Sequence, residues 1–92
     1  MGQYNKRTDA NQSAMVKHIS RIPGCRVIDL SGVGRGCPDI LIQQYRGGVY
    51  KLHLVEIKTD KGKLNKLQTQ FHAEHHCHVA RNLNDIWRIL GL

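Results

Sequence analysis

Two carboxylates and one amine stand at a spacing that would bring them together in a small sheet. Asp39 precedes the apolar residues 40–42, Glu56 and Lys58 follow the largely apolar residues 52–55, and 16 residues separate Asp39 from Glu56. Side chains two apart on a strand share a face, so Glu56 and Lys58 point the same way and a neighbouring strand can place Asp39 beside them. Crowded carboxylates repel unless a cation lies between them, and hard oxygen ligands with room for water suit Mg²⁺ or Mn²⁺. The pattern predicts a metal site for phosphodiester hydrolysis.

Each residue of this site has an expected role. Asp39 and Glu56 would hold the cation together with the backbone carbonyl of Ile57, and the cation would polarise the phosphorus. Lys58 would position or activate the attacking water and neutralise charge in the transition state. A second interpretation is that Pro38-Asp39 belongs to a turn and that Glu56 and Lys58 form an exposed ion pair. Both halves occur together, in order and beside apolar strands, which favours the catalytic interpretation.

Length and charge narrow the class of protein. The chain of 92 residues is expected to form one domain, and 14 Lys and Arg against 7 acids give a formal net charge of +7. A small, strongly basic domain is predisposed to bind nucleic acid. Three cysteines without CxxC spacing argue for a reducing setting. With no run long enough to span a membrane, we expect a soluble, cytoplasmic protein.

The rest of the sequence predicts the elements that position the site. Thr8 or Asp9 caps the first helix, and Gly47-Gly48 between two β-prone runs indicates a hairpin. We expect the few aromatic residues mostly to fill the core. The expected elements are a helix ended by residues 23–24, strands at 26–30, 40–45 and 49–57, a helix at 64–76, a strand at 77–80 and a last helix begun by Asn82, Asn84 or Asp85.

This order of elements, helix, three strands, helix, strand and helix, describes an α/β fold with a mixed sheet flanked by helices. Residues 31–38 are dense in glycine and are expected to form an irregular loop, whereas residues 1–8 are expected to form a flexible basic arm. Several cations of these segments flank the proposed metal site and are expected to contact DNA phosphates. They are Lys6, Arg7, Arg35, Lys61, Lys63 and Lys66.

Four histidines and a cysteine near the end of the second predicted helix suggest another site. His72 and His76 stand four apart, a helical spacing that can bind zinc, and Cys77 follows. A second pair of ligands at zinc-finger spacing is absent from the sequence, so we favour exposed helical imidazoles that gain charge as the pH falls. A zinc-dependent interaction domain is a further functional hypothesis.

The chain resembles the VRR-NUC domain, the virus-type replication and repair nuclease module of the PD-(D/E)xK superfamily. The resemblance runs through residues 9–12, 36–39, 55–58 and 64–71, and is to a small stand-alone member of the kind found in bacteriophages. It implies a restriction-endonuclease-like fold, Mg²⁺ or Mn²⁺ as cofactor, and hydrolysis of DNA phosphodiesters. It also implies a catalytic role for Gln68, whose amide would hydrogen-bond the attacking water or steady Lys58.

One position departs from the family. Members commonly carry a glutamate on the first helix near the metals, and Gln12 occupies the matching place here. An amide oxygen is a weaker, neutral ligand, so Gln12 is only a candidate further ligand and a second metal would be held less firmly.

The resemblance also implies a substrate. Stand-alone members look like homodimers that cut branched DNA such as Holliday junctions in DNA repair, because two sites related by a two-fold axis can nick two strands. The alternative is a noncatalytic DNA-binding module on a degenerate nuclease fold.

Overall fold

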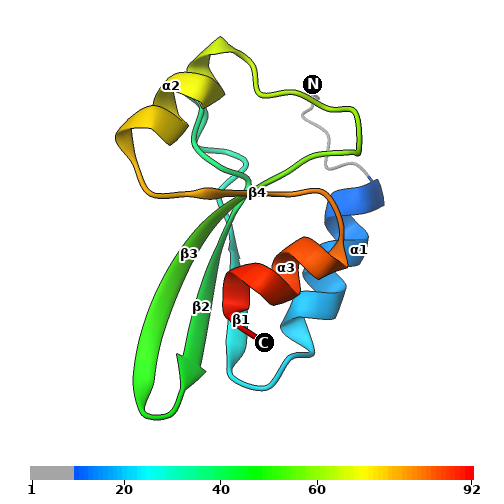
Figure 1. Ribbon diagram of the computed structural model, residues 1–92, viewed down its shortest axis with the longest axis vertical. Coiled ribbons are helices and arrows are strands. Elements are labelled where there is room, and N and C mark those ends of the chain that lie inside the picture. The colour runs from blue at the N-terminus through cyan, green and yellow to red at the C-terminus, as the bar shows by residue number, and fades with distance from the viewer. Residues whose placement is uncertain (1–9) are drawn as a thin grey trace.

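The computed structural model describes residues 10–92, which form a small α/β domain with a four-stranded mixed sheet and three helices (Figure 1). The predicted α/β class and mixed sheet are confirmed. Thr8, Asp9 and the predicted basic arm lie outside the described residues. In chain order the elements are α1 (Ala10–Ser20), β1 (Cys25–Asp29), β2 (Ile40–Arg46), β3 (Val49–Ile57), α2 (Lys66–Glu74), β4 (His78–Ala80) and α3 (Leu83–Leu90).

The sheet follows the chain, with strand order β1-β2-β3-β4. β1 to β3 pair antiparallel, and β4 joins β3 in parallel after the crossover through α2. The predicted hairpin is confirmed: Gly47 and Gly48 link β2 to β3 with φ values of 59° and 81°, a conformation in which glycine carries no steric penalty. The hairpin fixes the register in which Ile40 faces Val55.

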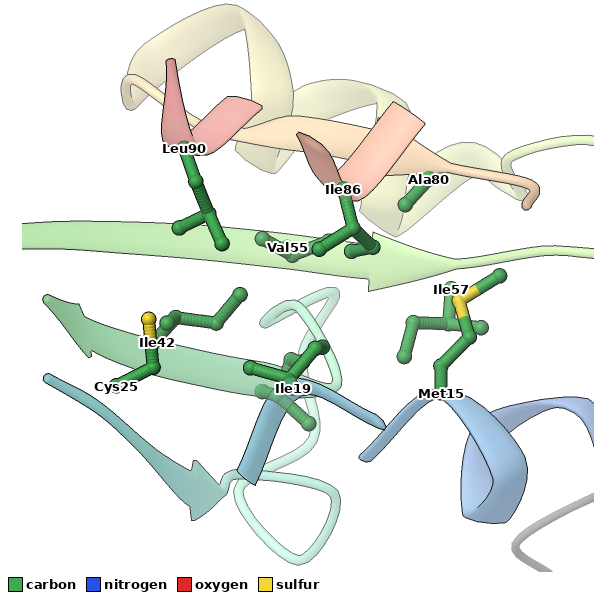
Figure 2. Packing of buried hydrophobic residues seen from close by; sticks show 10 residues of the cluster. Met15, Ile19, Cys25, Ile42, Val55, Ile57, Ala80, Ile86 and Leu90 are labelled. Carbon is green, nitrogen blue, oxygen red and sulfur yellow. The ribbon is translucent and has the colours of Figure 1, made fainter. Parts of the chain in front are cut away.

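The core lies between one face of the sheet and the helices α1 and α3. Alternation along β2 and β3 sends Ile40, Ile42, Val55 and Ile57 to this face, and all four are buried. Figure 2 shows the side chains of Ile42, Val55 and Ile57 among those that α1 and α3 contribute. The residues that α1, α3, β1 and β4 add to the cluster are Met15, Ile19, Cys25, Ala80, Ile86 and Leu90.

The opposite face of the sheet is largely uncovered at the hairpin end. Ile28, Tyr45, Tyr50 and Leu52 point to this side and are between 48% and 65% exposed. Trp87, on α3, is 40% exposed. The expectation that most aromatic residues fill the core is therefore wrong for Tyr45, Tyr50 and Trp87. The register of β2 and β3 places the two tyrosines on the face of the sheet that α1 and α3 leave uncovered.

The ends of the helices differ from the predicted ones, most of all in α2. This helix covers Lys66–Glu74 instead of 64–76, because Asn65 caps its start and His75 is already extended. No residue of α2 is buried, so hydrophobic periodicity gives no information about where it ends. The last helix starts after Asn82, one of its three candidate caps. None of the helices within residues 10–92 has the length and apolar character needed to cross a membrane.

The loop of residues 31–38 packs against α2 through one glycine. Gly36 has a φ of 83°, and a Cβ added there would overlap the backbone carbonyl of Leu67. Only glycine combines this backbone conformation with so close an approach. The contact holds the loop, and with it the start of β2 at Asp39, beside the first turn of α2.

Replacing Gly36 by alanine is expected to destabilise the protein by about 2 kcal/mol, because the substitution adds a left-handed strain and a backbone overlap. The matched control is Gly34→Ala, which shares the left-handed conformation (φ 77°) but has open space around its Cβ. Urea unfolding of both variants measures the difference. Equal losses would show that the approach of Gly36 to Leu67 is unimportant.

Candidate active site

Asp39 and Glu56 lie side by side at the end of the sheet opposite the hairpin turn. Asp39 directly precedes Ile40, which faces Val55, so the register carries Asp39 to Glu56 on the next strand. The side chain of Asp39 is held by the backbone, since its Oδ2 accepts a hydrogen bond of 2.8 Å from the amide of Ile57. Both carboxylates point away from the core face to which Val55 and Ile57 contribute.

Glu56 is the most unusual residue of this site, because it is a carboxylate that is only 2% exposed. Its Oε2 lies 3.5 Å from Nζ of Lys58 and accepts a hydrogen bond of 3.0 Å from Nε2 of Gln68. Its Oε1 is buried without a hydrogen-bond partner among residues 10–92. Burial, and then repulsion from Asp39, raise the pKa of Glu56 to about 7, although Lys58 acts in the opposite direction.

Gln68 connects Glu56 to the start of α2, and its predicted contact with the attacking water stays a prediction. Its Oε1 accepts from the amide of Asn65 while Asn65 accepts from the amide of Gln68, so the two residues form a capping box. The Nε2 of Gln68 remains free to donate, and it donates to Glu56 rather than steadying Lys58. Gln68 is therefore a positioning residue for the buried carboxylate.

The donor set fits a hard divalent cation. Asp39 and Glu56 offer oxygen atoms at one place, and the partnerless Oε1 of Glu56 is a buried acceptor that a cation would satisfy. The same cation would relieve the repulsion between the two carboxylates. The backbone amide of Ile57 donates a hydrogen bond to Asp39. The backbone carbonyl of Ile57 stays a predicted ligand.

The first helix reaches the site through a residue that the sequence analysis did not assign to it. Nδ2 of Asn11 donates a hydrogen bond of 3.2 Å to the backbone carbonyl of Lys58. Gln12 is buried and lines a hollow with Asp29 and Ile40, and neither Asp39 nor Glu56 lines that hollow. Asn11 is thus an α1 side chain that steadies the backbone at Lys58, and the ligand role of Gln12 stays a prediction.

The predicted phosphate contacts that can be placed are all exposed. Gly36 packs against Leu67, and each has a cation directly before it in the chain, Arg35 and Lys66. Both cations therefore lie where the loop meets α2. Lys61 and Lys63 lie in the segment that follows Lys58. Lys6 and Arg7 lie outside the described residues.

Arg81 holds the turn of residues 59–62 in place, although no sequence pattern predicted this role for Arg81. Its Nη1 donates to the backbone carbonyls of Thr59 (2.7 Å), Asp60 (3.3 Å) and Gly62 (2.6 Å). A guanidinium that donates hydrogen bonds to several backbone carbonyls of one turn stiffens that turn. Arg81 therefore ties the segment after Lys58 to the end of β4.

Replacing Arg81 by alanine is expected to lower stability by about 1–2 kcal/mol and to slow any cleavage about tenfold, because the turn after Lys58 loses three charge-assisted hydrogen bonds. The control is Arg88→Ala, which removes an exposed ion pair with Asp85 on α3. Unfolding in urea and a cleavage rate on the same preparations test this. An Arg81→Ala variant as fast and as stable as Arg88→Ala would contradict it.

The histidine cluster does not form the predicted arrangement. Because α2 ends at Glu74, His76 is not on the same helix as His72. The prediction that these two residues form a helical pair of zinc ligands is therefore wrong. The expectation of exposed helical imidazoles is also wrong in part, since His72 is half-buried and His78 lies on β4. Among residues 10–92, no group of three or more His, Cys, Asp and Glu side chains is arranged to hold a metal ion.

The three cysteines are free thiols in this structure. Burial raises the pKa of Cys37 and of Cys77, and the negative charge of Glu56 adds to the effect. Both thiols therefore favour the protonated form, which is a poor metal ligand.

Comparisons of the chain with protein-family models, with curated proteins and with solved structures gave no match. The geometry of Asp39, Glu56, Lys58 and Gln68 is accordingly the basis on which a function can be proposed.

Proposed function

We propose that the protein is a Mg²⁺- or Mn²⁺-dependent DNA endonuclease of the PD-(D/E)xK type, with a VRR-NUC fold. One observation carries the proposal: Glu56 is a buried carboxylate beside Asp39, with one oxygen held by Lys58 and Gln68 and the other without a partner among the described residues. Folding a carboxylate into such a place is costly unless a ligand uses it.

An exposed structural ion pair accounts for these contacts less well. A surface Glu-x-Lys pair keeps both side chains in water and contributes little to stability. Here the carboxylate side chain is 3% exposed and the Lys58 side chain 19%. The side-chain amide of Gln68 on α2 also orients Glu56, which serves positioning more than stability.

The residues divide the chemistry between them. Asp39 and Glu56 would hold the cation, which supplies Lewis acidity toward the phosphate when bound. Lys58 would offset the charge that builds up on the phosphate oxygens in the transition state. Gln68, Asn11 and Arg81 would keep these groups in place through the contacts described above.

The exposed cations around the site suit a phosphate backbone. Arg35, Lys61, Lys63 and Lys66 come from three neighbouring segments and are all solvent-exposed. Together with the net charge of +7, they favour a polyanionic substrate bound with strong salt dependence. We propose branched DNA, with a four-way junction as the preferred form, cut by a homodimer whose two sites act on two strands.

The deciding experiment incubates the protein with a labelled four-way junction, and separately with a matched plain duplex, in Mg²⁺, Mn²⁺ or EDTA. We expect cleavage with either metal, none in EDTA, and faster cleavage of the junction. Sedimentation of the protein alone and with the junction measures whether two copies act together. Binding without cleavage under both metals would contradict the nuclease proposal and support a noncatalytic DNA-binding module.

A further inference from the structure

His72 lies next to the catalytic residues in a way that their proposed roles do not explain. It is four residues after Gln68 on α2, and side chains at this spacing share a helix face. Gln68 uses that face to reach Glu56 at 3.0 Å. His72 is half-buried, and its Nε2 is buried with no hydrogen-bond partner within residues 10–92.

The surroundings of His72 favour its neutral form. Burial lowers the pKa of its imidazole, and the positive charge of Lys58 lowers it further. His78 on β4 lies nearby, and its own pKa falls through burial and through the nearby His76 and His72. A neutral imidazole whose buried nitrogen lacks a partner is available to accept a proton or a hydrogen bond.

The proposed site otherwise lacks a group that could take a proton. Lys58 is ion-paired with Glu56, and an ammonium has no lone pair to offer. Gln68 is an amide, and both ends of its side chain are engaged. Asp39 and Glu56 are the expected cation ligands, which leaves His72 as the free base on the α2 side of the site.

We propose that His72 is a further catalytic residue, the general base that takes a proton from the attacking water. This inference rests on the proposed nuclease function. As the water O–H bond breaks, its proton passes to the imidazole, and the water oxygen forms a bond to phosphorus. The phosphorus–oxygen bond to one sugar then breaks, the departing oxygen takes a proton from solvent water, and the imidazole returns its proton to solvent. Lys58 stabilises the charge on the phosphate oxygens.

The test compares His72→Gln, His72→Ala and the control His76→Gln, which changes an exposed imidazole four residues away. Single-turnover cleavage of the four-way junction in Mg²⁺ is measured from pH 5 to pH 9. We expect the wild-type rate to rise with pH as His72 deprotonates, in addition to the rise that accompanies deprotonation of Glu56. His72→Gln should be slower by about 100-fold or more and should keep only the rise due to Glu56, and His76→Gln should match the wild type.

A second readout separates catalysis from structure. Added imidazole should restore part of the rate of His72→Ala without affecting Glu56→Gln, and both His72 variants should melt near the wild-type temperature because α2 has no buried residue. A His72→Gln rate within threefold of wild type, with the same pH profile, would overturn the inference. A slow His72→Ala that imidazole does not rescue would also overturn it, since this marks a structural role.

The two proposals fail differently. If the wild-type protein cleaves no DNA in Mg²⁺ or Mn²⁺, the nuclease proposal falls and the role of His72 falls with it. If the wild type cleaves and His72→Gln cleaves equally fast, only the general-base assignment is lost.

Discussion

Glu56→Gln is expected to reduce cleavage by at least about 1000-fold while leaving DNA binding nearly unchanged. The substitution keeps the shape of the side chain and its contact with Gln68, but removes the charge that would hold the cation next to Asp39. The exposed cations that would bind phosphates are untouched. Junction cleavage and a gel-shift titration with the same DNA measure the two effects separately.

The chain offers a matched control for this experiment. Glu74 is the other glutamate of the sequence and is exposed at the end of α2. Glu74→Gln should therefore cleave at the wild-type rate despite the same change in charge. A Glu56→Gln protein that cleaves within tenfold of the wild type would remove Glu56 from the catalytic site.

The second large effect concerns stability, pH and metal together. The pKa of Glu56 is raised from 4.5 to about 7 in the folded protein. The folded state thus binds this proton more tightly than the unfolded state does, so the contribution of Glu56 is fully present below about pH 4.5 and is lost as the pH rises through about 7. For the metal-free protein, this amounts to at most about 3 kcal/mol.

Three outcomes follow for urea unfolding. In EDTA, Glu56→Gln should be as stable as the wild type at pH 5 and more stable at pH 8, since a neutral amide avoids the buried charge. At pH 8, Mg²⁺ should stabilise the wild type and leave Glu56→Gln unchanged. The pKa values of His53, His72 and His78 are lowered, so these residues destabilise the folded protein as the pH falls. Comparing the wild type with Glu56→Gln removes this effect, because both proteins contain the three histidines. If the wild type and the variant show the same pH dependence, the buried-carboxylate explanation is wrong.

The sequence was sufficient to predict the parts of the fold that depend on neighbours along the chain. Gly47-Gly48 and the alternating β2 and β3 residues predicted the hairpin, and the period of two put Glu56 and Lys58 on one side. The hairpin register then brought Asp39 to Glu56. These are local properties, and they account for the three central residues of the candidate site.

The remaining contacts depend on the tertiary fold, and no pattern in the sequence predicted which residues would meet. Arg81 reaches carbonyl groups about 20 residues earlier only because β4 pairs with β3 after the crossover. Likewise, Gln68 meets Glu56 because Gly36 lets the loop approach α2. The ends of α2 were mispredicted because its stability comes from its Asn65 cap and from polar contacts, which apolar periodicity cannot report.

Those polar attachments of α2 have a consequence for how the protein loses activity. The helix that orients Glu56 contributes no residue to the core that α1, α3 and the sheet share. A segment held mainly by hydrogen bonds can open locally at a lower free energy than the whole domain. Inactivation by mild heat or low urea would then precede global unfolding, and amide hydrogens of residues 66–74 would exchange with solvent sooner than those of β2 and β3.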